Sequence, residues 1–142
     1  FAIWRQENFH ELERHFTGDK RFTWQVPDSA DCLVTIYGQG HLLTHGDQAS
    51  GGGGIGGIWP PVMRLRARKQ QRHMATGRPF QVMWMGHWHQ LTQTPTLVVN
   101  GSLKGYDEYA MLMNFGFERP QQALAVVTPE HGVTWQCPVF VD

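Results

Sequence analysis

Two histidines flank a single tryptophan in residues 85–89, MGHWH, directly after the apolar run at residues 80–85. Imidazole is the usual nitrogen ligand for zinc, iron and manganese in hydrolytic centres. A strand that breaks into a loop at this point can aim His87 and His89 at two metal ions that lie close together. The alternative is that both are ordinary loop histidines with Trp88 packed beside them.

A third histidine follows a second apolar strand. Residues 42–47, LLTHGD, place His45 at the end of the strand, and Gly46 then lets the backbone turn. Strand ends that present functional side chains build a site at the carboxyl edge of an open α/β sheet. His45 alone also fits a polar residue at the end of a hairpin. The two histidine-bearing strand ends together favour a metal site formed by His45, His87 and His89.

These two segments, THGD at residues 44–47 and GHWH at residues 86–89, resemble the last two metal motifs of the calcineurin-like metallophosphoesterase superfamily. Their order and the strands before them also fit, and Asn100 begins an Asn-Gly-Ser sequence that often follows in that superfamily. Residues 100–109, NGSLKGYDEY, are similar to bacterial and phage-borne members. The resemblance covers most of the chain from about Asp31 onward, so the sequence is identified as the C-terminal half of such a domain.

The resemblance implies an enzyme that hydrolyses phosphomonoesters or phosphodiesters, with a nuclease or nucleotide phosphodiesterase as a subtype. It implies two divalent metal ions (Mn, Zn, Fe or Mg), with His45 and His87 on one ion and His89 on the other. Such a dinuclear centre activates water for in-line attack on phosphorus. The implied fold is an αββα sandwich of two mixed sheets, of which this chain supplies the second half.

The earlier motifs of the superfamily are missing from this sequence. They provide Asp-x-His, Gly-Asp-x-x-Asp and Asn-His-Asp patterns, and Gly18-Asp19 lacks the second aspartate of the middle one. Three neutral imidazoles leave two cations under-coordinated and their charge uncompensated. A missing N-terminal half or a partner chain is therefore expected to complete the site. The alternative is a catalytically silent remnant that serves as a structural or interaction domain.

Length and composition indicate an ordinary globular chain. Its 142 residues are 41% hydrophobic and 17% charged with zero net charge, so overall charge indicates no particular partner. With only two cysteines, a reduced, cytoplasmic setting is the expectation, and no membrane partner is expected because no apolar run approaches the roughly 20 residues that cross a bilayer. The chain begins at Phe1 without a methionine or a signal peptide, as expected of a fragment of a longer protein.

Hydrophobic periodicity predicts a single domain over residues 1–142 of the mixed α/β class, with a mixed β-sheet covered by helices on one side. The spacing predicts two helices, at residues 1–16 and 59–75. The predicted strands span residues 21–26, 32–37, 41–44, 80–85, 97–99, 123–128 and 133–137.

Two further segments have functional interpretations. The glycine-dense residues 50–57 predict a mobile flap over the metal site, with a simple linker as the alternative. Arg64, Arg68 and Arg72 share one stripe of the second helix and are candidate substrate-binding residues for a nucleic acid, a nucleotide or another phosphorylated substrate. The alternative for the stripe is a solvated helix face.

Overall fold

The computed structural model describes residues 2–51, 57–112 and 114–141, and it divides into two compact units, Phe1–Cys32 and Leu33–Asp142. The first unit is too short to bury a hydrophobic core of its own, so it does not by itself make a second domain. The extent of a single domain over residues 1–142 stays a prediction.

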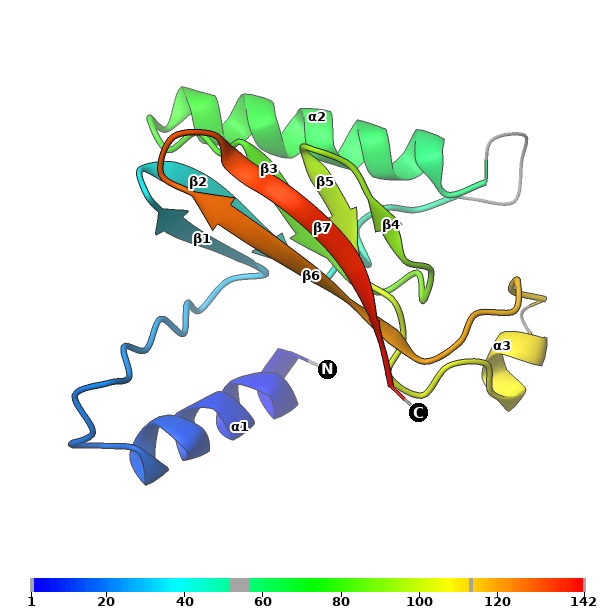
Figure 1. Ribbon diagram of the computed structural model, residues 1–142, viewed down its shortest axis with the longest axis horizontal. Helices are drawn as coiled ribbons and strands as arrows, with labels where there is room; N and C mark the ends of the chain where they lie inside the picture. Colours follow the sequence, from blue (N-terminus) through cyan, green and yellow to red (C-terminus); the bar gives the residue numbers. More distant parts are fainter. Residues whose placement is uncertain (1, 52–56, 113, 142) are drawn as a thin grey trace. The chain divides into compact units, whose positions relative to one another are not determined.

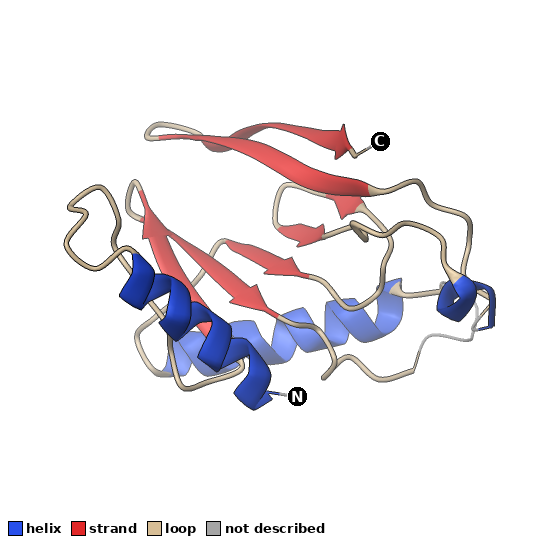
Figure 2. Cartoon of the chain, turned by 90° about the horizontal axis from the view of Figure 1, so that it is seen from below, coloured by secondary structure: helices blue, strands red, loops and turns tan. Residues whose placement is uncertain are grey.

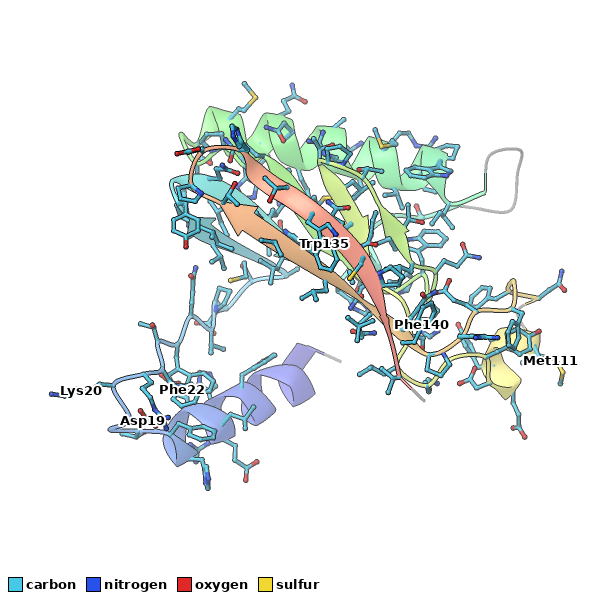
Figure 3. All side chains as sticks on the ribbon, in the orientation of Figure 1. Asp19, Lys20, Phe22, Met111, Trp135 and Phe140 are labelled. Carbon is cyan, nitrogen blue, oxygen red and sulfur yellow. The ribbon has the colours of Figure 1, made fainter. Side chains whose placement is uncertain are left out.

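The first unit consists of helix α1 (Ala2–His15) and the extended segment that follows it. Residues 21–26 are not a strand, so the prediction of one here was wrong. The alternating aromatic pattern serves local packing instead: the ring of Phe22 lies 4.6 Å from that of Phe16 and 6.0 Å from that of Trp24 (Figure 3). No neighbouring strand pairs with this segment among the described residues, and backbone pairing is what makes an extended segment a strand.

The second unit is built on a five-stranded sheet in the order β1-β2-β3-β5-β4 (Figure 1). β2 is parallel to β3 and β3 is parallel to β5, whereas β4 is antiparallel to β5, so the sheet is mixed as predicted. A two-residue turn, Tyr37 and Gly38, joins β1 to β2, and both residues have the positive φ angles that a tight hairpin turn requires. The strands are β1 (Asp31–Ile36), β2 (Gln39–Thr44), β3 (Val82–Met85), β4 (Thr92–Gln93) and β5 (Leu97–Val99).

Helix α2 (Trp59–Ala75) covers one face of this sheet, and the antiparallel hairpin of β6 (Gln121–Thr128) and β7 (Gly132–Phe140) lies over the other (Figure 2). A short helix, α3 (Glu108–Leu112), precedes the hairpin. The sequence predicted α2 with the bounds that it has. The arrangement confirms the mixed α/β class and the mixed sheet with helical cover on one side.

The hydrophobic core lies between α2 and the sheet. β3 is buried because it is the middle strand, and α2 contributes its apolar stripe, which includes Val62 and Leu65. Lys69 continues that stripe and is almost fully buried, with its Nζ donating to Oε1 of Gln48 at 2.8 Å. The core residues are Leu42, Ala49, Val62, Leu65, Phe80, Met83, Met85, Leu97 and Val99.

The glycine-dense segment leads from β2 towards α2. The flap predicted for residues 50–57 falls largely on residues 52–56, which lie outside the described residues. Within the described part of the chain, no helix has both the length and the apolar character needed to cross a membrane.

Candidate metal centre

The carboxyl ends of three parallel strands meet at one edge of the sheet. Thr44 of β2 is in register with Met85 of β3, which is in register with Val99 of β5. His45, His87 and Asn100 follow these strand ends within one or two residues. The edge is held by backbone hydrogen bonds: the Gly86 amide donates to the His45 carbonyl at 3.1 Å, and the Asn100 amide donates to the Met85 carbonyl at 2.7 Å.

The structure brings His45 and His87 together. Their ring centroids are 5.2 Å apart and the ring planes meet at 75°, an edge-to-face arrangement. Gly46, the residue after His45, is closely packed: a Cβ there would lie 2.5 Å from Cε of Met85 and 3.2 Å from the Gly86 carbonyl oxygen. The two imidazoles thus lie close together at the ends of adjacent parallel strands.

The loop after β3 has an unusual backbone. His87 has φ 71° and His89 has φ 54°, and both values lie in the left-handed region that residues with a side chain seldom adopt. Such conformations cost about 1–3 kcal/mol each and cluster at functional sites. Two of them within three residues support a functional role for this loop.

His89 lies in an aromatic setting. Its ring centroid is 6.4 Å from that of Tyr109 and 6.3 Å from that of Phe115, and its buried Nδ1 finds no hydrogen-bond partner in the described part of the chain. A buried nitrogen without a hydrogen-bond partner carries a desolvation cost, which coordination of a metal ion would offset. Asp107 is the acidic neighbour: the Lys104 ammonium, and to a smaller degree the Ala110 amide and His89, hold the pKa of its carboxyl below the usual range.

The residues fit a metal centre only in part. In residues 2–51, 57–112 and 114–141, no three histidine, cysteine, aspartate or glutamate side chains form a group that could hold an ion. The close rings of His45 and His87 and the unpartnered buried Nδ1 of His89 are the features that would suit a bound metal ion. The assignment of all three histidines as metal ligands stays a prediction.

Asn100 holds the hairpin to the edge that carries the histidines. Its Nδ2 donates to Oε1 of Gln122 at 2.6 Å, and its Oδ1 accepts the amide hydrogen of Ala123 at 2.8 Å. The sequence indicated Asn100 only as the start of an Asn-Gly-Ser segment. Its contacts with β6 lie more than twenty residues along the chain, so local pattern gave no signal for them.

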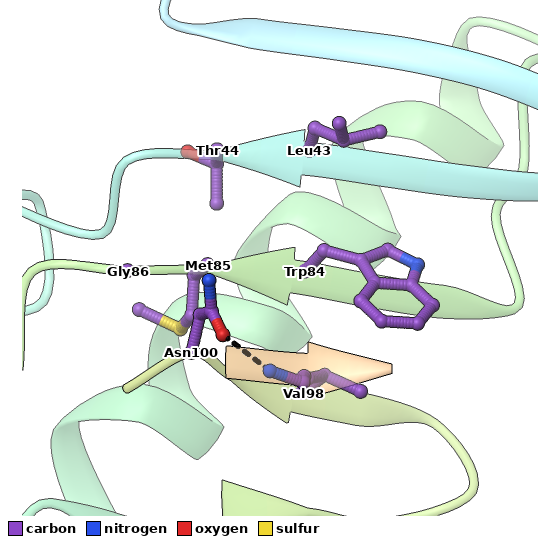
Figure 4. Close-up of a pocket in the computed structure, with 8 residues that line it drawn as sticks. Leu43, Thr44, Trp84, Met85, Gly86, Val98 and Asn100 are labelled. Carbon is purple, nitrogen blue, oxygen red and sulfur yellow. Dashed lines mark hydrogen bonds between the residues drawn. The ribbon is translucent and has the colours of Figure 1, made fainter. Parts of the chain in front are cut away.

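A cleft of about 320 Å³ opens between the sheet and β6 beside the same edge (Figure 4). Sequence reasoning missed it, because its walls come from four different strands. The lining residues are Leu43, Thr44, Trp84, Met85, Gly86, Val98, Asn100 and Ala123.

The basic stripe lies on the outer side of α2. Arg64, Arg68 and Arg72 are exposed, whereas Val62 and Leu65 on the opposite side of the helix face the core. Because α2 joins parallel strands, it runs opposite to them and begins near the carboxyl edge. Arg72 lies about 12 Å further along the helix axis than Arg64, at 1.5 Å per residue. A substrate-binding role for the stripe stays a prediction.

Comparison with known proteins identifies the fold. Neither protein-family models nor curated protein sequences match the chain. The structure of a single mutant of Vps29 from Entamoeba histolytica is similar, with a TM-score of 0.50 and 14% identity over 85% of this chain and 66% of that one. This chain therefore has a fold similar to that of Vps29.

Two more Vps29 structures are similar at 14% identity. Wild-type Vps29 from Entamoeba histolytica complexed with Zn²⁺ gives a TM-score of 0.49 over 82% of this chain and 63% of that chain. Vacuolar protein sorting 29 from Cryptosporidium parvum gives 0.48 over 96% of this chain and 77% of that chain. The chain thus spans slightly less than two thirds of the Entamoeba proteins.

Proposed function

We propose that this chain supplies the histidine side of a dinuclear metal centre that hydrolyses phosphoester bonds and is completed by segments outside this chain. The observation that supports it most is the edge-to-face contact of His45 and His87 at 5.2 Å, on the carboxyl ends of adjacent parallel strands. The strained backbone of His87 and His89 and the metallophosphoesterase-like fold point the same way.

We assign the following roles to the residues in this proposal. His45 and His87 would hold one divalent cation, and His89, whose Nδ1 lacks a partner, would contact the other. When bound, the cations supply Lewis-acid polarisation of the phosphoryl group. Gly46 keeps the two strand-end imidazoles close, and Asn100 keeps β6 beside the strand ends. The carboxylates that such a centre needs come from outside the chain.

Metal titration of the isolated chain tests this proposal. Isothermal titration with Mn²⁺ and with Zn²⁺ should show binding that His45→Ala and His87→Ala each weaken by at least about tenfold, since even partners outside the ligand shell cost that much. His131→Ala is the matched control, because His131 is an exposed histidine in the β6–β7 turn. Equal losses in all three variants would contradict a site at the strand ends.

An interaction domain is the second candidate, and the outer face of the β6–β7 hairpin favours it. Val126 is opposite Trp135 in the hairpin register, and Trp135 is 52% exposed (Figure 3). Leu124 and Val139 are also exposed on these strands. An apolar sheet surface with an exposed tryptophan is typical of protein–protein interfaces. Sedimentation of the wild type and of Trp135→Glu would test self-association through this face.

A further inference from the structure

The cleft beside the metal edge has a continuous apolar wall. Leu43 is in register with Trp84, and Trp84 is in register with Val98, so the three side chains form a row across three neighbouring parallel strands (Figure 4). Ala123 of β6 lines the opposite side. The row is on the face of the sheet away from α2, because the alternate residues Leu42 and Met83 belong to the core under that helix.

This cleft is lined by residues that adjoin the candidate metal centre in the sequence. Thr44 and Gly86 line it, and each is joined by a peptide bond to one of the histidines, His45 and His87. Leu43 and His45 are two residues apart, the spacing that places side chains on the same face of an extended strand. A molecule whose phosphoryl group is held by the histidines would therefore have this open cleft beside it.

The polar atoms of two lining side chains are already engaged. The indole N–H of Trp84 donates to Nδ1 of His41 at 3.0 Å, and Asn100 is bonded to Gln122 and to the Ala123 amide. The surface offered to a ligand is therefore mostly hydrocarbon and indole. Sugar hydroxyls in such a cleft would lose their water hydrogen bonds without replacement, which is costly. An apolar group has no hydrogen bonds with water to lose, and its removal from water is favourable.

The volume limits the size of that group. A cavity of roughly 150 Å³ lined by apolar side chains accepts one benzene ring. The present cleft, at about 320 Å³, is twice as large. It matches a group of about two fused rings or a short branched alkyl chain.

We propose that the cleft receives the apolar alcohol portion of the phosphoester substrate, an aryl group of about two fused rings. The phosphoryl group then lies against the strand-end histidines, His45 and His87. This inference rests on the proposed phosphoesterase function and adds the substrate class: phosphoesters of small aryl alcohols rather than of sugars.

Binding to the 142-residue chain tests the inference without a need for turnover. Isothermal titration in Mn²⁺ would compare 1-naphthyl phosphate, ribose 5-phosphate and inorganic phosphate. Each buried CH₂ equivalent strengthens binding about fourfold. The naphthyl ester should therefore bind on the order of thirtyfold more tightly than inorganic phosphate, even when only part of the ring system is buried. Ribose 5-phosphate should bind no more tightly than inorganic phosphate.

A pair of variants locates the effect. Ala123→Leu adds three carbons inside the cleft, and Ala125→Leu adds them two residues further along the same face of β6, outside the cleft lining. Ala123→Leu should abolish the advantage of the naphthyl ester and leave phosphate binding unchanged, while Ala125→Leu should leave both unchanged. Circular dichroism would verify that both variants are folded. The comparison of the three ligands on the wild-type chain tests the inference even if a variant does not fold.

The outcomes separate the two proposals. Metal-dependent phosphate binding with no advantage for the naphthyl ester overturns the cleft assignment and leaves the proposed function standing. Equal effects of the two leucine substitutions also overturn it. If neither phosphate nor the naphthyl ester binds in the presence of Mn²⁺, the proposed function fails and this inference fails with it.

Discussion

Gly46 offers the sharpest test of the geometry at the strand ends. Its φ of +102° lies in the region that side-chain-bearing residues seldom adopt, and a Cβ would lie 2.5 Å from Cε of Met85. The same Cβ would lie 3.4 Å from Cβ of His87. Gly77, just after α2, has φ +69° but open space around its Cα. Gly46→Ala therefore adds backbone strain and a steric clash, whereas Gly77→Ala adds only backbone strain.

The expected magnitudes follow from these two contributions. A left-handed residue with a Cβ costs roughly 1–2 kcal/mol at either position. Overpacking a filled site costs about 1–3 kcal/mol more, and only Gly46→Ala should show it. We expect the free energy of unfolding to fall by about 2–5 kcal/mol for Gly46→Ala and by about 1–2 kcal/mol for Gly77→Ala.

Urea unfolding followed by circular dichroism measures the loss of unfolding free energy in both variants, provided that its slope against urea concentration is unchanged. Metal titration adds a second readout, because the new Cβ in Gly46→Ala would lie 3.2 Å from the carbonyl oxygen of Gly86, the residue before His87. Its Mn²⁺ affinity should fall, and that of Gly77→Ala should not. Equal destabilisation of the two variants, or unchanged metal binding in Gly46→Ala, would refute the close packing of Gly46 against the histidine.

Three further predictions concern activity, pH and the basic stripe. The isolated chain should show little hydrolysis of a chromogenic phosphodiester in Mn²⁺. If the wild-type chain instead turns over the substrate rapidly and His87→Ala does not, the ligands within this chain are enough for catalysis. Burial lowers the pKa of His41, so the folded state disfavours protonation of its ring. The stability that the neutral ring contributes is therefore fully present above the unfolded pKa of about 6.5. That contribution is lost as the pH falls from there towards the lowered pKa of the folded state. His41→Gln should remove that part of the pH dependence in thermal unfolding, and an unchanged slope would contradict it. Replacing the exposed Arg64, Arg68 and Arg72 with glutamine should weaken single-stranded DNA binding and reduce its salt slope, and unchanged DNA binding would favour a solvated face.

The sequence predicted the edge of the sheet well because that edge depends on local signals. The apolar run before Met85 is typical of a middle strand, and the pattern of α2 gave its bounds correctly. A histidine after each of two parallel strands places both at the same edge, whatever the rest of the fold does. The contact of His45 with His87 was therefore predictable from strand order alone.

Features that depend on distant parts of the chain were not predictable in the same way. The alternating pattern at residues 21–26 indicated a strand, but pairing needs a neighbour, and local aromatic packing took its place. The setting of His89 depends on Tyr109 and Phe115, about twenty residues later, and the cleft needs Ala123 from β6. Periodicity within a single strand or helix does not contain this information.

The positive charge of a bound metal ion would favour an anionic ligand at the candidate centre. The strand-end histidines His45 and His87 are neutral when they act as ligands, so they leave the full charge of a divalent cation uncompensated. Asp107, whose carboxyl pKa is lowered mainly by Lys104 and least by His89, already accepts hydrogen bonds from Lys104 and from the Ala110 amide. The carboxylates proposed to come from outside the chain would supply part of the missing negative charge, and an anion such as a phosphoester would add to it. Because coupling between two ligands is reciprocal, a phosphoester that strengthens metal binding is itself bound more tightly by the same factor in the presence of the metal.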